Sequence, residues 1–93
     1  MLKRLEINKI ITKIIMEKLS MGVNVVNHMK SEINKDATTT GFILDFTGMQ
    51  YCSTVVFKQI IADMQTRFNG QYQLQVEGAN QLIAESFKAA FRK

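Results

Sequence analysis

Several residue types are absent or nearly absent from this chain. It contains no proline and a single cysteine, Cys52. One cysteine excludes an intramolecular disulfide, and a lone thiol is typical of a reducing compartment. No segment approaches the roughly 18 consecutive apolar residues of a membrane span, and charged residues interrupt the N-terminal stretch where an export signal needs an apolar run. We therefore expect a cytoplasmic protein with one domain, residues 1–93, and no linker.

The side chains that carry most enzyme chemistry are also scarce. His28 is the only histidine, and neither it nor Cys52 has companions at metal-ligand spacing. We interpret His28 as a helix-surface or partly buried residue. A thiol near a helix N-terminus can have a lowered pKa, but no glycine or arginine follows Cys52 as a phosphatase-type loop would require. The five glycines form no nucleotide-binding fingerprint. We therefore expect no catalytic residue, no metal and no cofactor.

Positive charge is in moderate excess, with 12 lysines and arginines against 8 acidic residues. A basic domain can bind phosphates, so a small nucleic-acid-binding α/β protein is an alternative. The lysines alternate with isoleucines, however, and no aromatic residues lie between them to stack on bases. This pattern favours a solvated basic face.

The first nineteen residues carry two competing patterns. Leu5 and Ile7 alternate as in a strand, but the same stretch also contains a helical stripe, formed by Ile7, Ile10, Ile11, Ile14 and Ile15. Because β-branched side chains pack well on a pleated surface, we predict two short strands, at about 4–9 and 13–18. One helix is the alternative.

A helix and a buried strand are predicted next. Ser20 is suited to cap a helix that runs to about Asn34, with an apolar face made of Val23, Val26, Met29 and Ile33. The polar run that follows indicates a loop. The apolar segment 42–46 lies between turn signals, which predicts a strand buried on both faces.

Periodicity predicts three more elements. A helix over about 53–68 has one apolar stripe, made of Phe57, Ile60, Ile61, Met64 and Phe68, and Asn69-Gly70 ends it. A strand over 72–76 alternates apolar residues with glutamines. After a turn at 77–80, the last helix has an inward face made of Ile83, Phe87, Ala90 and Phe91.

The resulting order, β-β-α-β-α-β-α, predicts a small α/β domain with helices packed on a mixed four-stranded sheet. Alternating strands and helices imply parallel pairs joined by right-handed crossovers. The first two strands would pair as a hairpin at one edge. Their apolar residues, if exposed, are equally able to support a homodimer.

The most informative segment is 42–54, where the buried strand enters a glycine-containing turn and then a helix. The Asp45 carboxylate is expected to accept the Thr47 backbone N–H and to shape this turn. Ser53 and Thr54 open the helix, where a hydroxyl can cap free N–H groups and a phosphate would meet the favourable end of the helix dipole.

From Leu44 to Thr54 the chain resembles the STAS domain, the fold of anti-sigma factor antagonists. It is most similar to the short STAS-like domains of unknown function, whose first helix begins like Ser20-Met21-Gly22. In the antagonists, a kinase-like ATPase of the histidine-kinase type phosphorylates the residue that opens the helix after this turn. The matching position is Thr54 if Ser53 stands where the family has aspartate, or Ser53 if the register moves by one.

The resemblance implies a non-enzymatic regulatory module that binds a protein partner and is switched by phosphorylation. The partner-binding residues would be those of the turn, namely Thr47, Gly48, Met49, Gln50 and Tyr51. Met49 and Tyr51, if exposed, would provide apolar anchors. Tyr51 pointing inward is the other possibility. An enzyme built on Cys52 is a third and weaker hypothesis.

Overall fold

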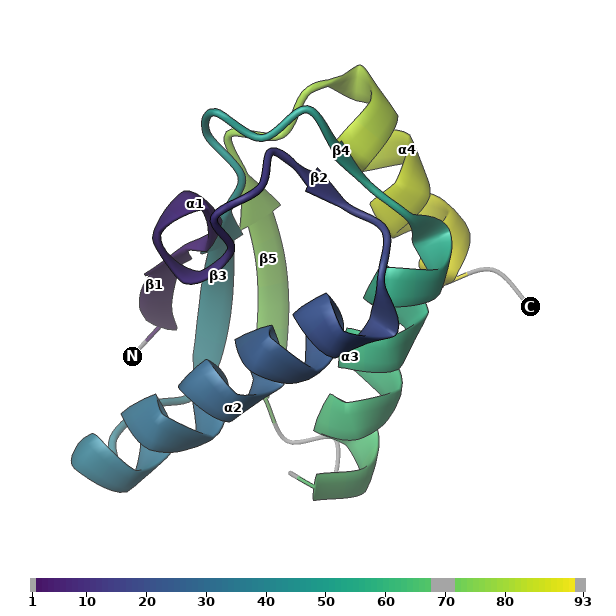
Figure 1. The fold of residues 1–93 in the computed structure, drawn as a ribbon. Helices are drawn as coiled ribbons and strands as arrows, with labels where there is room; N and C mark the ends of the chain where they lie inside the picture. Colours follow the sequence, from purple (N-terminus) through teal and green to yellow (C-terminus); the bar gives the residue numbers. More distant parts are fainter. Residues whose placement is uncertain (1, 68–71, 92–93) are drawn as a thin grey trace.

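A computed structural model describes residues 2–67 and 72–91 (Figure 1). Strands and helices alternate along the chain apart from two consecutive strands in its middle, and short elements lie near the N-terminus. In chain order they are β1 (Leu2–Glu6), α1 (Ile7–Ile10), β2 (Ile15–Met16), α2 (Leu19–Lys35), β3 (Gly41–Asp45), β4 (Tyr51–Cys52), α3 (Thr54–Arg67), β5 (Gln73–Glu77) and α4 (Gln81–Ala90). The predicted α/β class is confirmed.

All strand pairs among the described residues are parallel. β3 lies between β1 and β5 in a three-stranded sheet, with Leu44 opposite both Leu5 and Val76. A separate two-stranded ladder joins β2 to β4. The structure therefore differs from the predicted mixed four-stranded sheet, because the N-terminal strands do not pair with each other.

The N-terminal prediction was wrong in its boundaries for a physical reason. Instead of one strand over 4–9, β1 ends at Glu6 and one helical turn follows. That turn brings Ile7 and Ile11, four residues apart, into the core together at 0% and 5% exposure. The predicted strand 13–18 is reduced to two residues, Ile15–Met16, which pair with β4 rather than with β1.

The three-stranded sheet is buried on one face. Phe42 and Leu44 point toward the helices and are fully buried, and Figure 1 shows α2 in front of the sheet and α3 beside it. On the opposite face Ile43 and Asp45 are only half-buried. The prediction that 42–46 is buried on both faces was therefore wrong, since charged and polar side chains occupy the outer face.

The predicted helix, capped by Ser20 and running to about Asn34, is α2, which begins at Leu19, two residues before the first helical position that a Ser20 cap implies. Its N-cap is Lys18, and no side chain caps it, so the prediction that Ser20 is the cap was wrong. Val26 and Met29 are buried as predicted, whereas Val23 is 40% exposed because the packed face is centred on Val25 and Val26. His28 is exposed, as expected for a helix surface.

The two C-terminal helices close the core. The predicted stripe of α3 is confirmed at Phe57, Ile60 and Met64, all buried. Aromatic rings link the sheet to both helices, since Phe57 contacts Phe46 at 5.4 Å and Phe87 at 5.2 Å between ring centroids.

Phe91 was predicted to face inward but is 56% exposed, because it follows the last turn of α4. Phe68 and Asn69-Gly70 lie outside the described residues. None of the helices in the described ranges is long and apolar enough to cross a membrane.

Candidate functional site

The turn after β3 is organised by Asp45. Its Oδ1 accepts hydrogen bonds from the Thr47 backbone N–H at 3.0 Å and from the Thr47 hydroxyl at 2.6 Å. The predicted turn-shaping role is therefore confirmed. Gly48 follows with φ at +84°, a left-handed conformation that favours glycine. The turn closes with the Met49 N–H donating to the Phe46 carbonyl at 2.9 Å.

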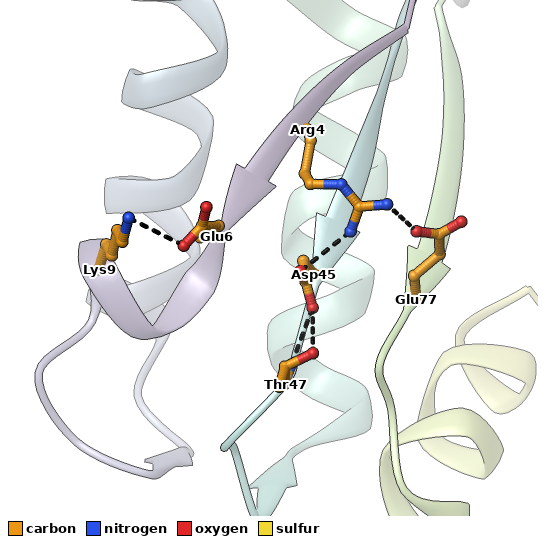
Figure 2. A network of polar contacts seen from close by, with 6 residues as sticks. All are labelled: Arg4, Glu6, Lys9, Asp45, Thr47 and Glu77. Carbon is orange, nitrogen blue, oxygen red and sulfur yellow. Dashed lines mark hydrogen bonds and ion pairs between the residues drawn. The ribbon is translucent and has the colours of Figure 1, made fainter.

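A charged network holds this turn to the sheet (Figure 2). Arg4 of β1 donates from Nη1 to Asp45 Oδ2 of β3 at 2.9 Å, and its other terminal nitrogen pairs with Glu77 of β5. The hydrogen bonds from Thr47, followed by those from Arg4, hold the pKa of Asp45 below its usual range. Sequence reasoning missed this network, because only the parallel register brings these three side chains to one face.

The turn residues predicted to bind a partner are not equally accessible. Thr47, Gly48 and Gln50 are exposed and Tyr51 is half-buried. Met49 is only 5% exposed and belongs to the core, because the closed turn directs its side chain inward. Met49 therefore does not meet the condition, exposure at the turn, under which it was expected to be an apolar anchor.

Ser53 caps α3. Its Oγ accepts the Val56 backbone N–H at 3.2 Å, which is the N-cap interaction expected from the sequence. Thr54 is the first residue of the helix, and both hydroxyl residues are half-buried. The first turn of α3 carries no acidic residue, so no side-chain carboxylate there offsets the positive end of the helix dipole.

The segment of β2 runs directly beside this corner. The Gln50 N–H donates to the Ile14 carbonyl at 2.8 Å, and the Ser53 N–H donates to the Met16 carbonyl at 2.9 Å. Ile15 pairs with Tyr51 in the ladder. We call the exposed and half-buried residues of 47–54, together with Ile14 and Ile15, the corner surface, and Met49 and Cys52 lie beneath it.

The ladder has an inner and an outer side. Met16 and Cys52 are fully buried on the inner side, whereas Ile15 is 40% exposed on the outer side, opposite half-buried Tyr51. Ile14, at 48% exposure, extends the apolar strip beside the turn. The apolar run of β2 was visible in the sequence, but its position beside 50–53 depends on tertiary pairing that no local pattern specifies.

Cys52 is part of the core. Burial raises the pKa of its thiol to about 12, the opposite of the lowering that a helix N-terminus can produce. Its Sγ lies 3.9 Å from the Ser53 carbonyl. The interpretation of Cys52 as a small apolar side chain beneath the turn is confirmed.

The other flank of the corner surface is fastened to α4. Asn80 caps α4 by accepting the Ile83 N–H at 2.9 Å, and its Nδ2 donates to the Gln50 carbonyl at 2.8 Å. One side chain thus joins a helix start to the candidate site, a link that sequence reasoning did not find.

Within the described ranges, histidine, cysteine, aspartate and glutamate side chains nowhere form a group of three that could hold a metal ion. Comparison with known proteins gave no matching family model, no matching curated protein and no matching solved structure.

Proposed function

We propose that this chain is a non-enzymatic regulatory module that binds a protein partner through the corner surface. The observation that carries this proposal is the arrangement at the start of α3. Ser53 and Thr54 are partly accessible there, beside the exposed apolar side chain of Ile15 and half-buried Tyr51. Apolar anchors next to modifiable hydroxyls suit a surface whose binding is switched by charge.

We further propose that the fold is STAS-like and that the partner is a kinase-like ATPase. The support is the order strand, Asp45, turn with Gly48, then a helix opened by Ser53 and Thr54, the segment from which the resemblance was drawn. Apart from the two-residue strand β4, the order β3, α3, β5, α4 is the strand and helix alternation that was expected from the sequence.

Phosphorylation of Ser53 or Thr54 would act on the partner rather than on the fold. A phosphate adds close to two negative charges, which the N-terminus of α3 tolerates or stabilises. Beneath a docked partner the same charge must lose its water, and each 1.4 kcal/mol lost weakens affinity roughly tenfold. The domain would stay folded while the interface failed.

Nucleic-acid binding receives less support. Much of the positive charge near the N-terminus is already paired, since Lys3 contacts Asp36 at 3.0 Å and Lys9 contacts Glu6 at 3.1 Å. Arg4 is held by two carboxylates. Paired cations release fewer counterions from a phosphate backbone, so the electrostatic contribution to affinity is smaller.

The test is capture of a nucleotide-binding ATPase from the source proteome, followed by affinity measurement with the purified pair. Ser53→Asp and Thr54→Asp are each expected to weaken binding by about tenfold or more. Ser53→Ala removes the cap without adding charge. Ser31→Asp is the matched control, because it adds the same charge at an exposed position away from the corner surface. Ser31 lies about 18 Å along α2 from Leu19, the end of the helix that follows β2.

If both aspartate variants bind like the unmodified protein, the switch is wrong. If Ile15→Ser also leaves affinity unchanged, the corner surface is not the docking site. Salt-sensitive retention of DNA or RNA by the purified domain, with no ATPase bound, would favour the nucleic-acid alternative instead.

A further inference from the structure

In the part of the chain that the structure describes, no strand pairs with the outer edge of β5. There β5 pairs with β3 alone, and two hydrogen bonds fix which of its backbone groups face β3. The Gln73 N–H donates to the Thr40 carbonyl at 3.2 Å, and the Glu77 carbonyl accepts the Phe46 N–H at 2.8 Å. Alternation along a parallel strand then turns the N–H and C=O groups of Leu74 and Val76 outward. No hydrogen bond from the described residues occupies them.

The side chains of Leu74 and Val76 are also incompletely covered. They point to the helix-covered face of the sheet, as Phe42 and Leu44 do on β3, yet they are only half-buried whereas Phe42 and Leu44 are fully buried. The uncovered apolar surface of Leu74 and Val76 lies at the edge where a further strand would add its own inward-pointing side chains.

Two hollows lie along this edge. One, of about 210 Å³, is lined by Leu74 and Tyr72 of the β5 segment together with Ile61, Met64, Gln65 and Phe91. The other, of about 290 Å³, is lined by Val76 and its neighbours Glu77, Gly78 and Ala79 together with Ala84, Phe87 and Lys88. The two β5 side chains are two residues apart, which is the repeat of side chains on one face of a strand.

The surroundings favour a strand as the occupant. Figure 1 shows α3 and α4 on the β5 side of the three-stranded sheet, and residues of α3 and α4 line the hollows. At the opposite edge, β1 carries Lys3, Arg4 and Glu6, charges of the kind that discourage pairing. β5 presents the uncharged Gln73 and Gln75 on its outer face, and its one charged residue, Glu77, is paired with Arg4.

We propose that the open edge of β5 is a strand-addition site for an extended segment of a protein partner. The segment carries apolar side chains at positions i and i+2, which enter the two hollows, and polar side chains on its other face. Main-chain hydrogen bonds to Leu74 and Val76 supply affinity, and the hollows supply specificity. This site is separate from the corner surface and does not depend on the function proposed above.

A second copy of the chain fits less well. Paired through β5, it would bring its own α3 and α4 onto the same face, where these helices already border the edge. Each copy also carries a net charge of +4, which opposes self-association.

The probe is a capped peptide, Lys-Thr-Val-Thr-Val-Thr-Lys, added to the ¹⁵N-labelled protein. Its terminal lysines exclude simple attraction to a basic domain. We expect the backbone amides of Leu74 and Val76 to exchange fast in the free protein, and their exchange to slow by about tenfold or more when peptide is added. The backbone N–H of Gln75 points toward β3, so its exchange should be slow with and without peptide. A peptide with threonine in place of both valines, and one N-methylated on its pairing edge, are each expected to lose this effect.

Ala84→Met tests the second hollow, because the longer side chain fills the space that the peptide would use. It is expected to weaken peptide binding by about tenfold. Glu85→Met is the matched control on the adjacent, exposed position of α4 and should change affinity by less than about twofold.

Three results would overturn the proposal. Slow exchange of the Leu74 and Val76 amides in dilute free protein would show that the edge is already occupied. Equal binding of the N-methylated peptide would exclude strand addition. Protection that rises with protein concentration in the absence of peptide would assign the edge to a second copy.

Discussion

Two glycines close to Asp45 have left-handed backbones but very different surroundings. Gly78 has φ at +64° and Gly48 has φ at +84°. A Cβ on Gly78 would collide with the Thr47 hydroxyl and lie 2.7 Å from Asp45 Oδ1, whereas a Cβ on Gly48 would meet only Asn8 Nδ2 at 3.7 Å. Backbone strain applies at both positions, and steric conflict at Gly78 alone.

Gly78→Ala is therefore expected to destabilise the protein by roughly 3 kcal/mol, combining overpacking with left-handed strain. Gly48→Ala should cost about 1 kcal/mol, from strain alone. Urea denaturation followed by circular dichroism measures both. Equal costs would mean that the contact between Gly78 and the Asp45–Thr47 turn is not rigid.

The protonation of Asp45 predicts a pH dependence. Because hydrogen bonds from Thr47 and then Arg4 lower its pKa in the folded state, its stabilising contribution is present above the unfolded pKa of about 3.9. It is lost as pH falls through the lower folded value. Asp45→Asn should therefore be less stable than the parent at pH 6, with a difference in urea midpoint that shrinks below about pH 4. A difference that stays constant from pH 6 to pH 2.5 would contradict this assignment.

Cys52 gives a chemical test of burial. With its pKa raised to about 12 by burial, the native thiol should react with a disulfide reagent at pH 8 at least about a hundredfold more slowly than the urea-unfolded thiol. The raised pKa also means that its contribution to stability is complete below the unfolded pKa and is lost as pH rises toward 12. Rapid labelling under native conditions would place the thiol at the surface.

At the scale of elements, the features that depend on neighbouring residues were predicted correctly more often than those that depend on pairing between distant segments. The Ser53 cap, the Asp45 turn and the strand 42–46 were predictable because each depends on neighbours within a few residues. Ser20 had the same local chemistry as Ser53, yet α2 begins at Leu19 and no side chain caps it, so a capping residue in the sequence does not by itself fix where a helix starts. The positions of Ile14 and Ile15 beside β4 depend on pairing across more than thirty residues, which no local pattern contains.

Asn80 joins α4 to the corner surface through two hydrogen bonds. Asn80→Ala removes both and should cost about 1–2 kcal/mol. Asn80→Asp keeps the acceptor that caps α4 but loses the donor to the Gln50 carbonyl. The aspartate variant should therefore be the more stable of the two. In its NMR spectrum the amide signals of Gln50 and Tyr51 should still shift relative to those of the parent protein. If the two variants have the same urea midpoint, the cap contributes little.

At the scale of the whole molecule, the sheet is unusual in having one polar face. Parallel sheets are generally covered on both faces. Here the outer face carries Arg4, Ile43, Gln75 and Glu77, which are exposed or half-buried. One layer of helices thus buries the inner face of the sheet, and polar contacts between neighbouring strands stabilise the outer face.

Arg4 is the centre of those contacts, since it pairs with Asp45 on β3 and Glu77 on β5 (Figure 2). It is the side chain that contacts both other strands of the sheet, so its loss should loosen β1 and β5 together rather than one pair.

Exposed ion pairs weaken with salt, because the Debye length falls to about 3 Å at 1 M. Arg4→Met, which keeps the apolar stem, should lower the urea midpoint at low ionic strength and approach the parent at 1 M sodium chloride. Lys9→Met is the matched control, because among the described residues Lys9 pairs with Glu6 alone, three residues away in the chain, and it should have a smaller effect. A deficit for Arg4→Met that is the same at both salt concentrations would mean that packing of the arginine stem, not charge, joins the three strands.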